Sequence, residues 1–303
     1  MILIAGGTGR LGTLIVRRLV DRGLEVRVLT RDPARARHLA GDRVTVVQGD
    51  VRDGHSLGAA AAGTAVTVSA VHGLVGPRDN SPATVDRDGN ANLVDAASAA
   101  GSDFVLLSTV GASAEHPMEL FRMKHAAEQH VIASGIPSTI VRATAFLELW
   151  LELLEKTAGR GGRPLVFGRG ANPINFVSVA DVAALVEIAV VDASTRGRIL
   201  EIGGPADLTL DQLARALQAS AGRDGPPRHL PPVMLRLMAD SAGRINPQLG
   251  RQARAALAMD RTDLTFDAAP ARRDYPDLPC RGIADVLAAS TGGDPQGAEL
   301  GSP

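Results

Sequence analysis

The residues Met1-Ile-Leu-Ile-Ala5 and Gly6-Gly-Thr-Gly-Arg-Leu-Gly12 decide the fold of this chain of 303 residues. The apolar run predicts a short buried strand, and the apolar residues at helical spacing after the glycines predict a helix. A glycine turn between a strand and a helix is typical of a dinucleotide site. Glycines let the backbone approach a pyrophosphate, and the helix N-terminus favours its negative charge. The alternative is a strand-to-helix turn that binds nothing.

The second predicted strand, Glu25–Thr30, ends at Arg31. An NAD site usually has an acidic residue near this point, about 20 residues past the glycines, to bind the ribose 2′-hydroxyl. A guanidinium suits a 2′-phosphate instead, because it offers several donors and a fixed positive charge. The sequence therefore predicts that NADP(H) is preferred over NAD(H), with Arg10 as a second candidate cation. The alternative is that Arg31 is an ordinary surface arginine and Asp32 contacts the ribose.

Length and composition limit the classes of protein to consider. A chain of 303 residues can form one large α/β domain or a domain with a smaller lobe. The net charge of −1 predicts no nucleic-acid partner. The single cysteine cannot form an internal disulfide, and the seven scattered histidines predict no metal site. We see no secretory signal and no apolar run that could span a bilayer, so we expect a cytoplasmic protein without a membrane partner.

Strand-like and helix-like segments alternate through the first two thirds of the chain. The expected strands are Met1–Ala5, Glu25–Thr30, Val44–Gln48, Val66–Val71, Asp103–Ser108, Ser138–Arg142 and Ile199–Ile202. The expected helices are Arg10–Asp21, Pro33–Ala40, Ala83–Ala100, Met118–Ser134, Ala145–Lys156, Ala180–Val191 and Leu210–Ala221. Short apolar strands separated by helices indicate a parallel sheet covered on both faces, with ligands beyond the carboxyl ends of the strands.

The predicted fold class is therefore α/β: a Rossmann-type, doubly wound parallel sheet with a smaller, mostly helical C-terminal lobe. We expect the NAD(P)-binding domain at residues 1–145. Residues 146–290 are expected to hold the remaining sheet elements, at about 174–205, interleaved with a small lobe. That lobe either caps the substrate or simply packs on the main core, and we see no sheet pattern after Gly222. The polar tail at 291–303 is expected to be disordered.

Several short motifs, in order and spacing, resemble the atypical short-chain dehydrogenase/reductase superfamily in its NmrA-like branch of NAD(P)-binding proteins. The matching segments are Ala5–Gly12, Thr30–Pro33, Gln48–Asp53, Asp95–Gly101, Leu107–Ala112, Lys124–Glu128, Ser134–Arg142, Phe176–Ala183 and Ile202–Pro205. The resemblance weakens after about residue 210. It implies a dinucleotide-dependent reductase or a related regulatory protein.

The resemblance also implies which residues bind the cofactor. They are Gly6, Thr8, Gly9, Arg10, Leu11, Gly12, Arg31, Asp50, Val51, Ala70, Val71, His72 and Lys124. The glycine turn is expected at the pyrophosphate, Arg31 at the 2′-phosphate, and Asp50 with Val51 beside the adenine. Residues 70–72 are expected to line the path to the nicotinamide. The local alternatives are that Asp50 caps a turn and that His72 is only a loop residue.

Lys124, Ser108 and Thr109 are the candidate catalytic residues that the resemblance implies. The two hydroxyls are expected to face the substrate; the alternative is that they only satisfy the backbone at a strand end. Lys124 is expected at the nicotinamide ribose. Only two of the 32 basic residues are lysines, and a compact ammonium suits two ribose hydroxyls better than a planar guanidinium. The alternative is a surface pair with Glu128 on the same helix.

The chain departs from the superfamily in one respect. Many members carry Tyr-x-x-x-Lys, but Leu120 stands four residues before Lys124, and the single tyrosine is Tyr275. One interpretation is an NADPH-dependent oxidoreductase that works without this tyrosine, because hydride transfer is the chemistry of the cofactor. Lys124, water or a ribose hydroxyl would then deliver the proton. The other interpretation is a redox-sensing regulator of NmrA type that binds NADP(H) without turnover.

The sequence does not name the substrate. Phe146, Leu147, Leu149 and Trp150 are candidates to line a pocket for a small apolar or quinone-like molecule, and core packing is the alternative. We therefore expect a small-molecule substrate as the partner. The helices expected at Ala83–Ala100 and Met118–Ser134 are candidates for pairing two subunits in a homodimer.

Overall fold

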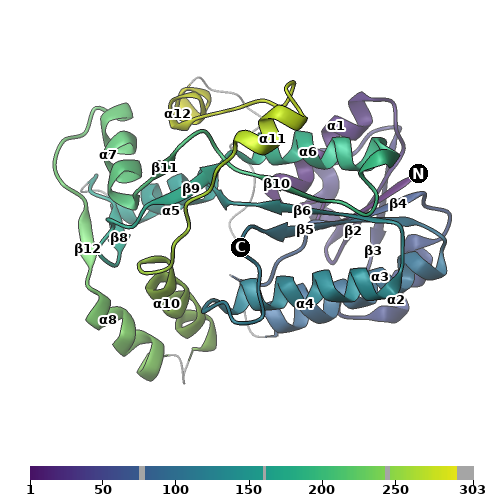
Figure 1. The fold of residues 1–303 in the computed structure, drawn as a ribbon, viewed down its shortest axis with the longest axis horizontal. Helices are drawn as coiled ribbons and strands as arrows, with labels where there is room; N and C mark the ends of the chain where they lie inside the picture. The colour runs from purple at the N-terminus through teal and green to yellow at the C-terminus, as the bar shows by residue number, and fades with distance from the viewer. Residues whose placement is uncertain (75–78, 160–161, 243–245, 292–303) are drawn as a thin grey trace. The chain divides into compact units, whose positions relative to one another are not determined.

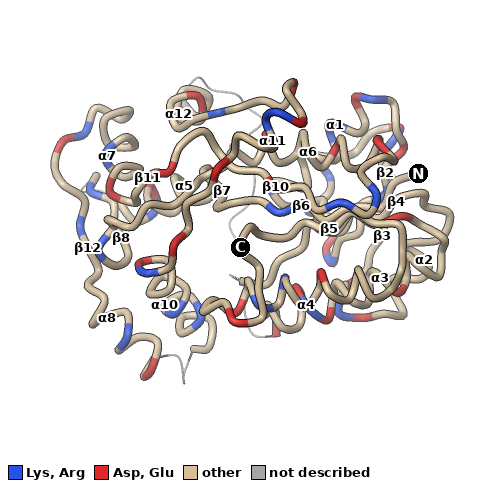
Figure 2. Tube along the Cα trace, viewed as in Figure 1, with Lys and Arg blue, Asp and Glu red and all other residues tan. Residues whose placement is uncertain are grey.

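The computed structural model describes residues 1–74, 79–159, 162–242 and 246–291. They form two compact units that each contain two stretches of the chain. The first unit comprises residues 1–143 and 180–202, and the second comprises 144–179 together with the chain from 203 onward. The predicted disordered tail lies, from residue 292 on, outside the described residues. Both signs of charge are interspersed along both units (Figure 2).

The first unit is built on a seven-stranded parallel sheet with strand order β10-β6-β5-β4-β1-β2-β3. The strands are β1 (Ile2–Ala5), β2 (Val26–Thr30), β3 (Val44–Gln48), β4 (Val66–Ser69), β5 (Asp103–Thr109), β6 (Ser138–Ala143) and β10 (Ile199–Ile202). The chain runs outward from β1 to β3 and then crosses back to β4 on the other side of β1. This reversal between β1 and β4 is the topological switch point, where ligands bind in such sheets. The predicted Rossmann-type fold is confirmed.

Helices cover both faces of this sheet (Figure 1). The α-helices are α1 (Arg10–Asp21), α2 (Gly54–Ala61), α3 (Asn90–Ala99), α4 (Glu119–Ser134) and α6 (Val179–Val191). The first unit also contains two 3₁₀-helices, η1 (Pro33–Leu39) and η4 (Ala193–Thr195), and a π-helix, η2 (Pro82–Gly89). In Figure 1, α1 and α6 lie on one face and α2, α3 and α4 on the other. Glu187 of α6 forms ion pairs with Arg18 of α1 and with Arg22, the residue that follows α1, and these pairs hold α1 and α6 together.

One hydrophobic core of the first unit lies between the sheet and the layer of α2, α3 and α4. Its fully buried side chains include Leu3, Leu57, Leu93, Phe104 and Leu106. Along β5, alternate residues face this layer, and apolar residues on α3 and α4 meet them at helical spacing. Burial of these apolar surfaces is the main contribution to the stability of the unit.

Two helix predictions in the first unit are wrong in detail. The expected single helix Ala83–Ala100 is a π-helix, η2, followed by α3. Asn90 Nδ2 donates to the backbone oxygen of Asp86, the acceptor that an α-helix reserves for the amide of Asn90, so the side chain competes with regular helix geometry. The expected helix Pro33–Ala40 is a 3₁₀-helix that ends at Leu39. Helix α2 was not expected, because its glycines and alanines give a weak apolar pattern.

The second unit is smaller in sheet content and richer in helix. Its strands are β7 (Ala145–Phe146), β8 (Leu165–Phe167), β9 (Ile174–Val177), β11 (Asp207–Leu208) and β12 (Arg228–Leu230). Its helices are α5 (Leu147–Ala158), α7 (Leu210–Ser220), α8 (Pro232–Leu237), η5 (Met238–Ala242), α10 (Pro247–Met259), α11 (Ala269–Asp274) and α12 (Ile283–Thr291).

Two small sheets organise these strands. β9 pairs with β7 and β11, separately from the central sheet that β10 joins. The expectation of no sheet after Gly222 is wrong, because β12 pairs in parallel with β8. A strand of three residues whose partner lies far away in the sequence leaves no periodic pattern that could reveal it.

Candidate functional site

The glycine turn between β1 and α1 lies at the carboxyl edge of the sheet, at the switch point. Gly6 has φ +85°, and a Cβ there would lie 2.6 Å from the backbone oxygen of Ala70. A Cβ on Gly12 would lie 2.1 Å from the oxygen of Gly6. The turn itself therefore excludes side chains at Gly6 and Gly12, because both positions press directly against backbone.

Gly9 differs from these two glycines. Its φ is −82°, and the nearest atom to a Cβ there would be 3.4 Å away, which is ordinary contact. Packing within the chain thus does not demand a glycine at this exposed position. Gly9 is the N-cap of α1, and no side chain caps the first amide groups of the helix. A small residue in front of uncapped N–H groups leaves room for an anion to approach them.

The neighbouring residues of the turn are arranged around this helix start. Leu11 is buried, and Thr8 and Arg10 are partly exposed. Thr13 donates its amide to the oxygen of Gly9 at 2.8 Å and its hydroxyl to the oxygen of Gly7 at 3.3 Å. The turn is therefore held in place by its own hydrogen bonds.

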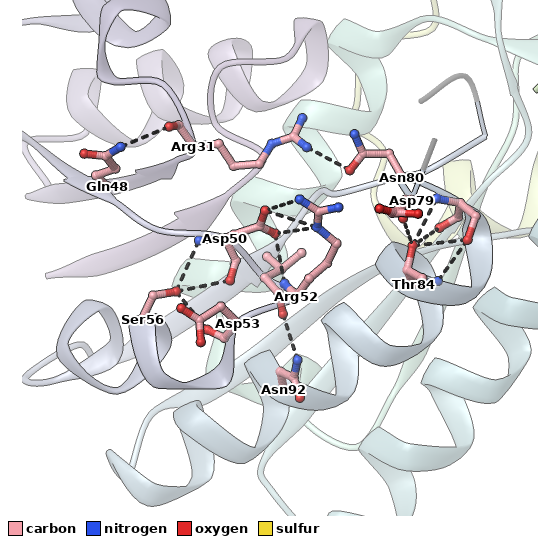
Figure 3. A network of polar contacts seen from close by, with 12 residues as sticks. Arg31, Gln48, Asp50, Arg52, Asp53, Ser56, Asp79, Asn80, Thr84 and Asn92 are labelled. Atoms are coloured by element: carbon pink, nitrogen blue, oxygen red, sulfur yellow. Dashed lines mark hydrogen bonds and ion pairs between the residues drawn. The ribbon is translucent and has the colours of Figure 1, made fainter. Parts of the chain in front are cut away.

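Polar residues gather at the ends of β2 and β3 (Figure 3). Arg31 is exposed, and its Nη1 donates to Asn80 Oδ1 at 2.8 Å. Asp32 instead caps η1, accepting from the amide of Ala34 at 2.9 Å. The alternative in which Asp32 contacts a ribose would compete with this cap. Of the two charged residues after β2, Asp32 thus binds the adjacent backbone, whereas the side chain of Arg31 binds Asn80, which is distant in sequence.

Asp50 follows β3 and is bound by Arg52 (Figure 3). Arg52 Nε lies 3.0 Å from Asp50 Oδ1, and Nη2 lies 2.5 Å from Oδ2. These hydrogen bonds lower the pKa of the Asp50 carboxyl from its ordinary value, although partial burial opposes them. The amide of Arg52 also donates to Asp50 Oδ1 at 3.0 Å, so the local turn-capping role is present. Val51 accepts from Asn92 Nδ2 through its oxygen at 2.9 Å.

The end of β4 contains the predicted residues 70–72. Ala70 donates its amide to the oxygen of Ala5 at 2.9 Å, which continues the pairing with β1 beyond the strand. The backbone oxygen of Val71 accepts a hydrogen bond from Lys124 Nζ at 3.0 Å, and His72 is exposed. These residues therefore lie directly beside the glycine turn, as the contact between Gly6 and Ala70 also requires.

Lys124 on α4 is buried, with 5% of its surface exposed. Its Nζ lies 3.0 Å from Asp86 Oδ1 and donates to the oxygens of Val71, at 3.0 Å, and Leu107, at 2.9 Å. The ammonium group thus joins the ends of β4 and β5 to η2. The alternative of a surface pair with Glu128 is wrong, since Glu128 is also buried and binds Arg142 of β6.

Asp86 was not identified from the sequence, although its side chain is fully buried. Its Oδ2 accepts from the amide of Gly73 at 2.8 Å, while Oδ1 faces Lys124. Asn80 and Arg52 were missed as well. No spacing signal connects Asp86 to Lys124 or Asn80 to Arg31, because these contacts are made between elements that are distant in sequence. Arg52 lies only two residues from its partner Asp50, so that pairing was open to prediction from the sequence.

Ser108 and Thr109 end β5, next to Leu107. Ser108 is buried, and its hydroxyl has no hydrogen-bond partner among the described residues. Thr109 is partly exposed and makes one long contact, 3.5 Å from Oγ1 to the oxygen of Val110. A buried hydroxyl without a partner costs free energy, so Ser108 is the better placed of the two to accept a further polar group.

The residues proposed for an apolar pocket all lie in the second unit. Leu147 is buried, and Trp150 packs edge-on against Phe176 with ring centroids 6.4 Å apart. Leu149 is 46% exposed. Leu147 and Trp150 therefore serve at least the core of that unit. Tyr275 follows α11 in the same unit.

Across the described ranges, no group of three or more His, Cys, Asp or Glu residues is arranged to hold a metal ion. None of the helices in the described part of the chain has both the length and the apolar character needed to cross a membrane.

Comparisons with known proteins agree with this architecture. The family model described as the NmrA-like family matches residues 1–245. The NAD(P)H azoreductase of Xenophilus azovorans is 31% identical over 224 residues, which cover 74% of each chain. Quinone oxidoreductase 2 of Escherichia coli is 28% identical over 225 residues, covering 74% of this chain and 75% of the relative. The crystal structure of an NADPH-dependent quinone oxidoreductase from Escherichia coli with NADPH superposes with a TM-score of 0.78 at 24% identity, covering 96% of this chain and 99% of that one.

Proposed function

The chain belongs to the NmrA-like family, and we propose that it is an NADPH-dependent oxidoreductase that reduces a small apolar, quinone-like or azo substrate. The names of two relatives, an NAD(P)H azoreductase and a quinone oxidoreductase, support this reaction class. The observation that carries the proposal is the glycine turn. It lies at the switch point of the sheet and places Gly9 before uncapped amide groups of α1.

The residues present fit a dinucleotide. The proposal assigns the pyrophosphate to Gly6–Gly12, the adenine to Asp50 and Val51, and the nicotinamide end to residues 70–72. Arg31 is assigned to the 2′-phosphate, for which it must exchange its bond to Asn80. A charge-assisted contact of this kind contributes about 1.5–3 kcal/mol, or a preference of about ten- to a hundredfold for NADPH over NADH.

The reduced nicotinamide, when bound, supplies a hydride, and a proton from solvent completes the two-electron reduction of a quinone to a quinol. Leu120 stands where a tyrosine would otherwise pass the proton. The proposal assigns Lys124 to positioning. All three acceptors around its ammonium belong to the chain itself, and they hold the ends of β4 and β5 in place. Ser108, with its unpartnered hydroxyl, is proposed to face the nicotinamide end or the substrate.

The test combines binding with turnover. NADPH and NADH are titrated by calorimetry into the wild-type protein and into Arg31→Ala, and NADPH oxidation is followed with a benzoquinone and with an azo dye. We expect tighter binding of NADPH, loss of that preference in Arg31→Ala, and oxidation that depends on the acceptor. Equal affinities for the two cofactors would contradict the NADPH assignment.

The same experiment also tests the second candidate function, a redox-sensing regulator that binds NADP(H) without turnover. Tight NADPH binding without oxidation by any acceptor would favour the redox-sensing regulator over the oxidoreductase. The missing tyrosine motif is the observation that keeps this function in view. The homodimer and the cytoplasmic location stay predictions from the sequence.

A further inference from the structure

A carboxylate lies in electrostatic range of the arginine that the proposed function assigns to the 2′-phosphate. Arg31 follows β2 and Asp50 follows the neighbouring strand β3, and Gln48 Nε2 donates to the oxygen of Arg31 at 3.4 Å. The positive charge of Arg31 is one of the causes that lower the pKa of Asp50, after the larger effect of Arg52. A phosphate bound at Arg31 would therefore also be repelled by the negative charge of Asp50.

Arg52 binds that carboxylate directly (Figure 3). Its guanidinium is forked around both oxygens: Nε lies 3.0 Å from Oδ1 and 3.1 Å from Oδ2, and Nη2 lies 2.5 Å from Oδ2. This bidentate geometry is the strongest that an arginine and a carboxylate form. Asp79 also acts electrostatically on Arg52, so one guanidinium balances two carboxylates near the strand ends.

Without Arg52, the charge of Asp50 would oppose a 2′-phosphate in two ways. The free carboxylate would repel a group that carries between one and two negative charges near neutral pH. It would also compete with the phosphate for the guanidinium of Arg31. NADH has a hydroxyl at this position, so neither effect would weaken its binding.

We propose that Arg52 is a specificity-determining residue, which masks Asp50 and thereby lets Arg31 select a 2′-phosphorylated dinucleotide. This inference rests on the proposed NADPH-dependent function and extends it to a residue outside the glycine turn and the β2 end. In this proposal Arg52 does not contact the cofactor. It is a positioning residue that acts through Asp50, whose negative charge it neutralises.

The expected effect is moderate, because both side chains are partly exposed, Arg52 to 33% and Asp50 to 24%. Water and salt screen the interaction at such a surface. We expect Arg52→Ala to weaken NADPH binding about fivefold at low ionic strength, which corresponds to about 1 kcal/mol. NADH binding should change less than about twofold.

The experiment is a double-mutant cycle read with two cofactors. NADPH and NADH are titrated by calorimetry into wild type, Arg52→Ala, Asp50→Asn and the double variant, each at low and high salt. Arg52→Lys keeps the charge without the fork. Arg87→Ala is the matched control, because Arg87 also binds one carboxylate through Nε and Nη2, that of its neighbour Asp88, and its loss removes the same charge.

The proposal requires three results together. Arg52→Ala must lower the NADPH preference more than Arg87→Ala does, Asp50→Asn must restore most of it in the Arg52→Ala background, and high salt must reduce the difference. Equal weakening of both cofactors, or no rescue by Asp50→Asn, would overturn it and assign Arg52 to the turn alone.

Failure of the inference can be separated from failure of the proposed function. If wild type prefers NADPH and Arg31→Ala abolishes that preference while Arg52→Ala does not, only the role of Arg52 is wrong. If wild type binds neither cofactor, the proposed function itself is wrong.

Discussion

Two pairs of acidic and basic side chains lie at the carboxyl edge of the same sheet, and they differ in burial. Asp86 and Lys124 have side chains that are 0% and 6% exposed, while those of Asp50 and Arg52 are 24% and 33% exposed. The first pair joins η2 to α4, and the second spans a single turn. The same chemistry thus supports two roles: the buried pair builds the strand ends, and the exposed pair adjusts the charge around them.

The physical reason is the environment of each charge. A buried ion that loses its partner keeps the full cost of having left water, so either half of the Asp86–Lys124 pair depends on the other. At the surface, water replaces the missing partner, and the net stabilisation is small. Substitutions in the buried pair should therefore mainly lower the free energy of unfolding. Substitutions in the exposed pair should mainly change the preference between NADPH and NADH.

The largest effect is expected for Asp86→Ala. It leaves the Lys124 ammonium buried and unpaired and removes the acceptor of the Gly73 amide. We expect the free energy of unfolding to fall by about 3–5 kcal/mol, measured by urea denaturation. Asp86→Asn keeps the shape of the side chain, so we expect it to lower the free energy of unfolding by less. Asp88→Ala, two residues away in an exposed pair, is the control, and an effect no larger than that of the control would contradict the comparison.

A smaller loss is expected for Lys124→Arg. Three acceptors surround a compact ammonium, and the wider guanidinium cannot satisfy all of them without displacing buried backbone. We expect a loss of about 1–3 kcal/mol in unfolding free energy, together with weaker NADPH binding as the end of β4 shifts. Lys156→Arg tests the same exchange at the exposed pair with Glu152 and should be nearly neutral.

The outcome at Lys124 also distinguishes its possible roles. Parent-like stability with lost turnover would show that the ammonium acts on the reaction and not on the strand ends. Parent-like stability, binding and turnover together would remove Lys124 from the site.

The smallest effect concerns stability at the exposed pair and its dependence on pH. The pKa of Asp50 is lowered by its hydrogen bonds to Arg52 from an ordinary value of 3.8. The stability that this shift contributes is therefore fully present above the unfolded value and is lost as the pH falls through the lowered native pKa. Arg52→Ala should reduce the unfolding free energy by at most about 1 kcal/mol at pH 7, and the difference from wild type should narrow below about pH 4. A difference that instead grows in acid would reverse the assigned sign.

The glycine turn and the alternation of strands and helices could be predicted because they are local. Residues 1–12 contain both the apolar strand and the glycines, and each strand of the central sheet is a short apolar run that is recognisable without its neighbours. The end of β2 at Thr30, just before Arg31, could be located for the same reason. The second unit was harder, because β8 and β12 are each three residues long and are defined only by their pairing.

The sequence by itself determined the fold class and the positions of Gly6, Gly9, Gly12, Arg31 and Lys124 along the chain. Only the tertiary structure decided what Lys124 does, because its partners Asp86, Val71 and Leu107 come from separate elements that meet when the sheet forms. Likewise, Asn80 reaches Arg31 from a loop on the other side of β1. Periodicity reports which face of an element is buried. It does not report which distant side chain will share that space, since long-range contacts depend on the order and register of the strands.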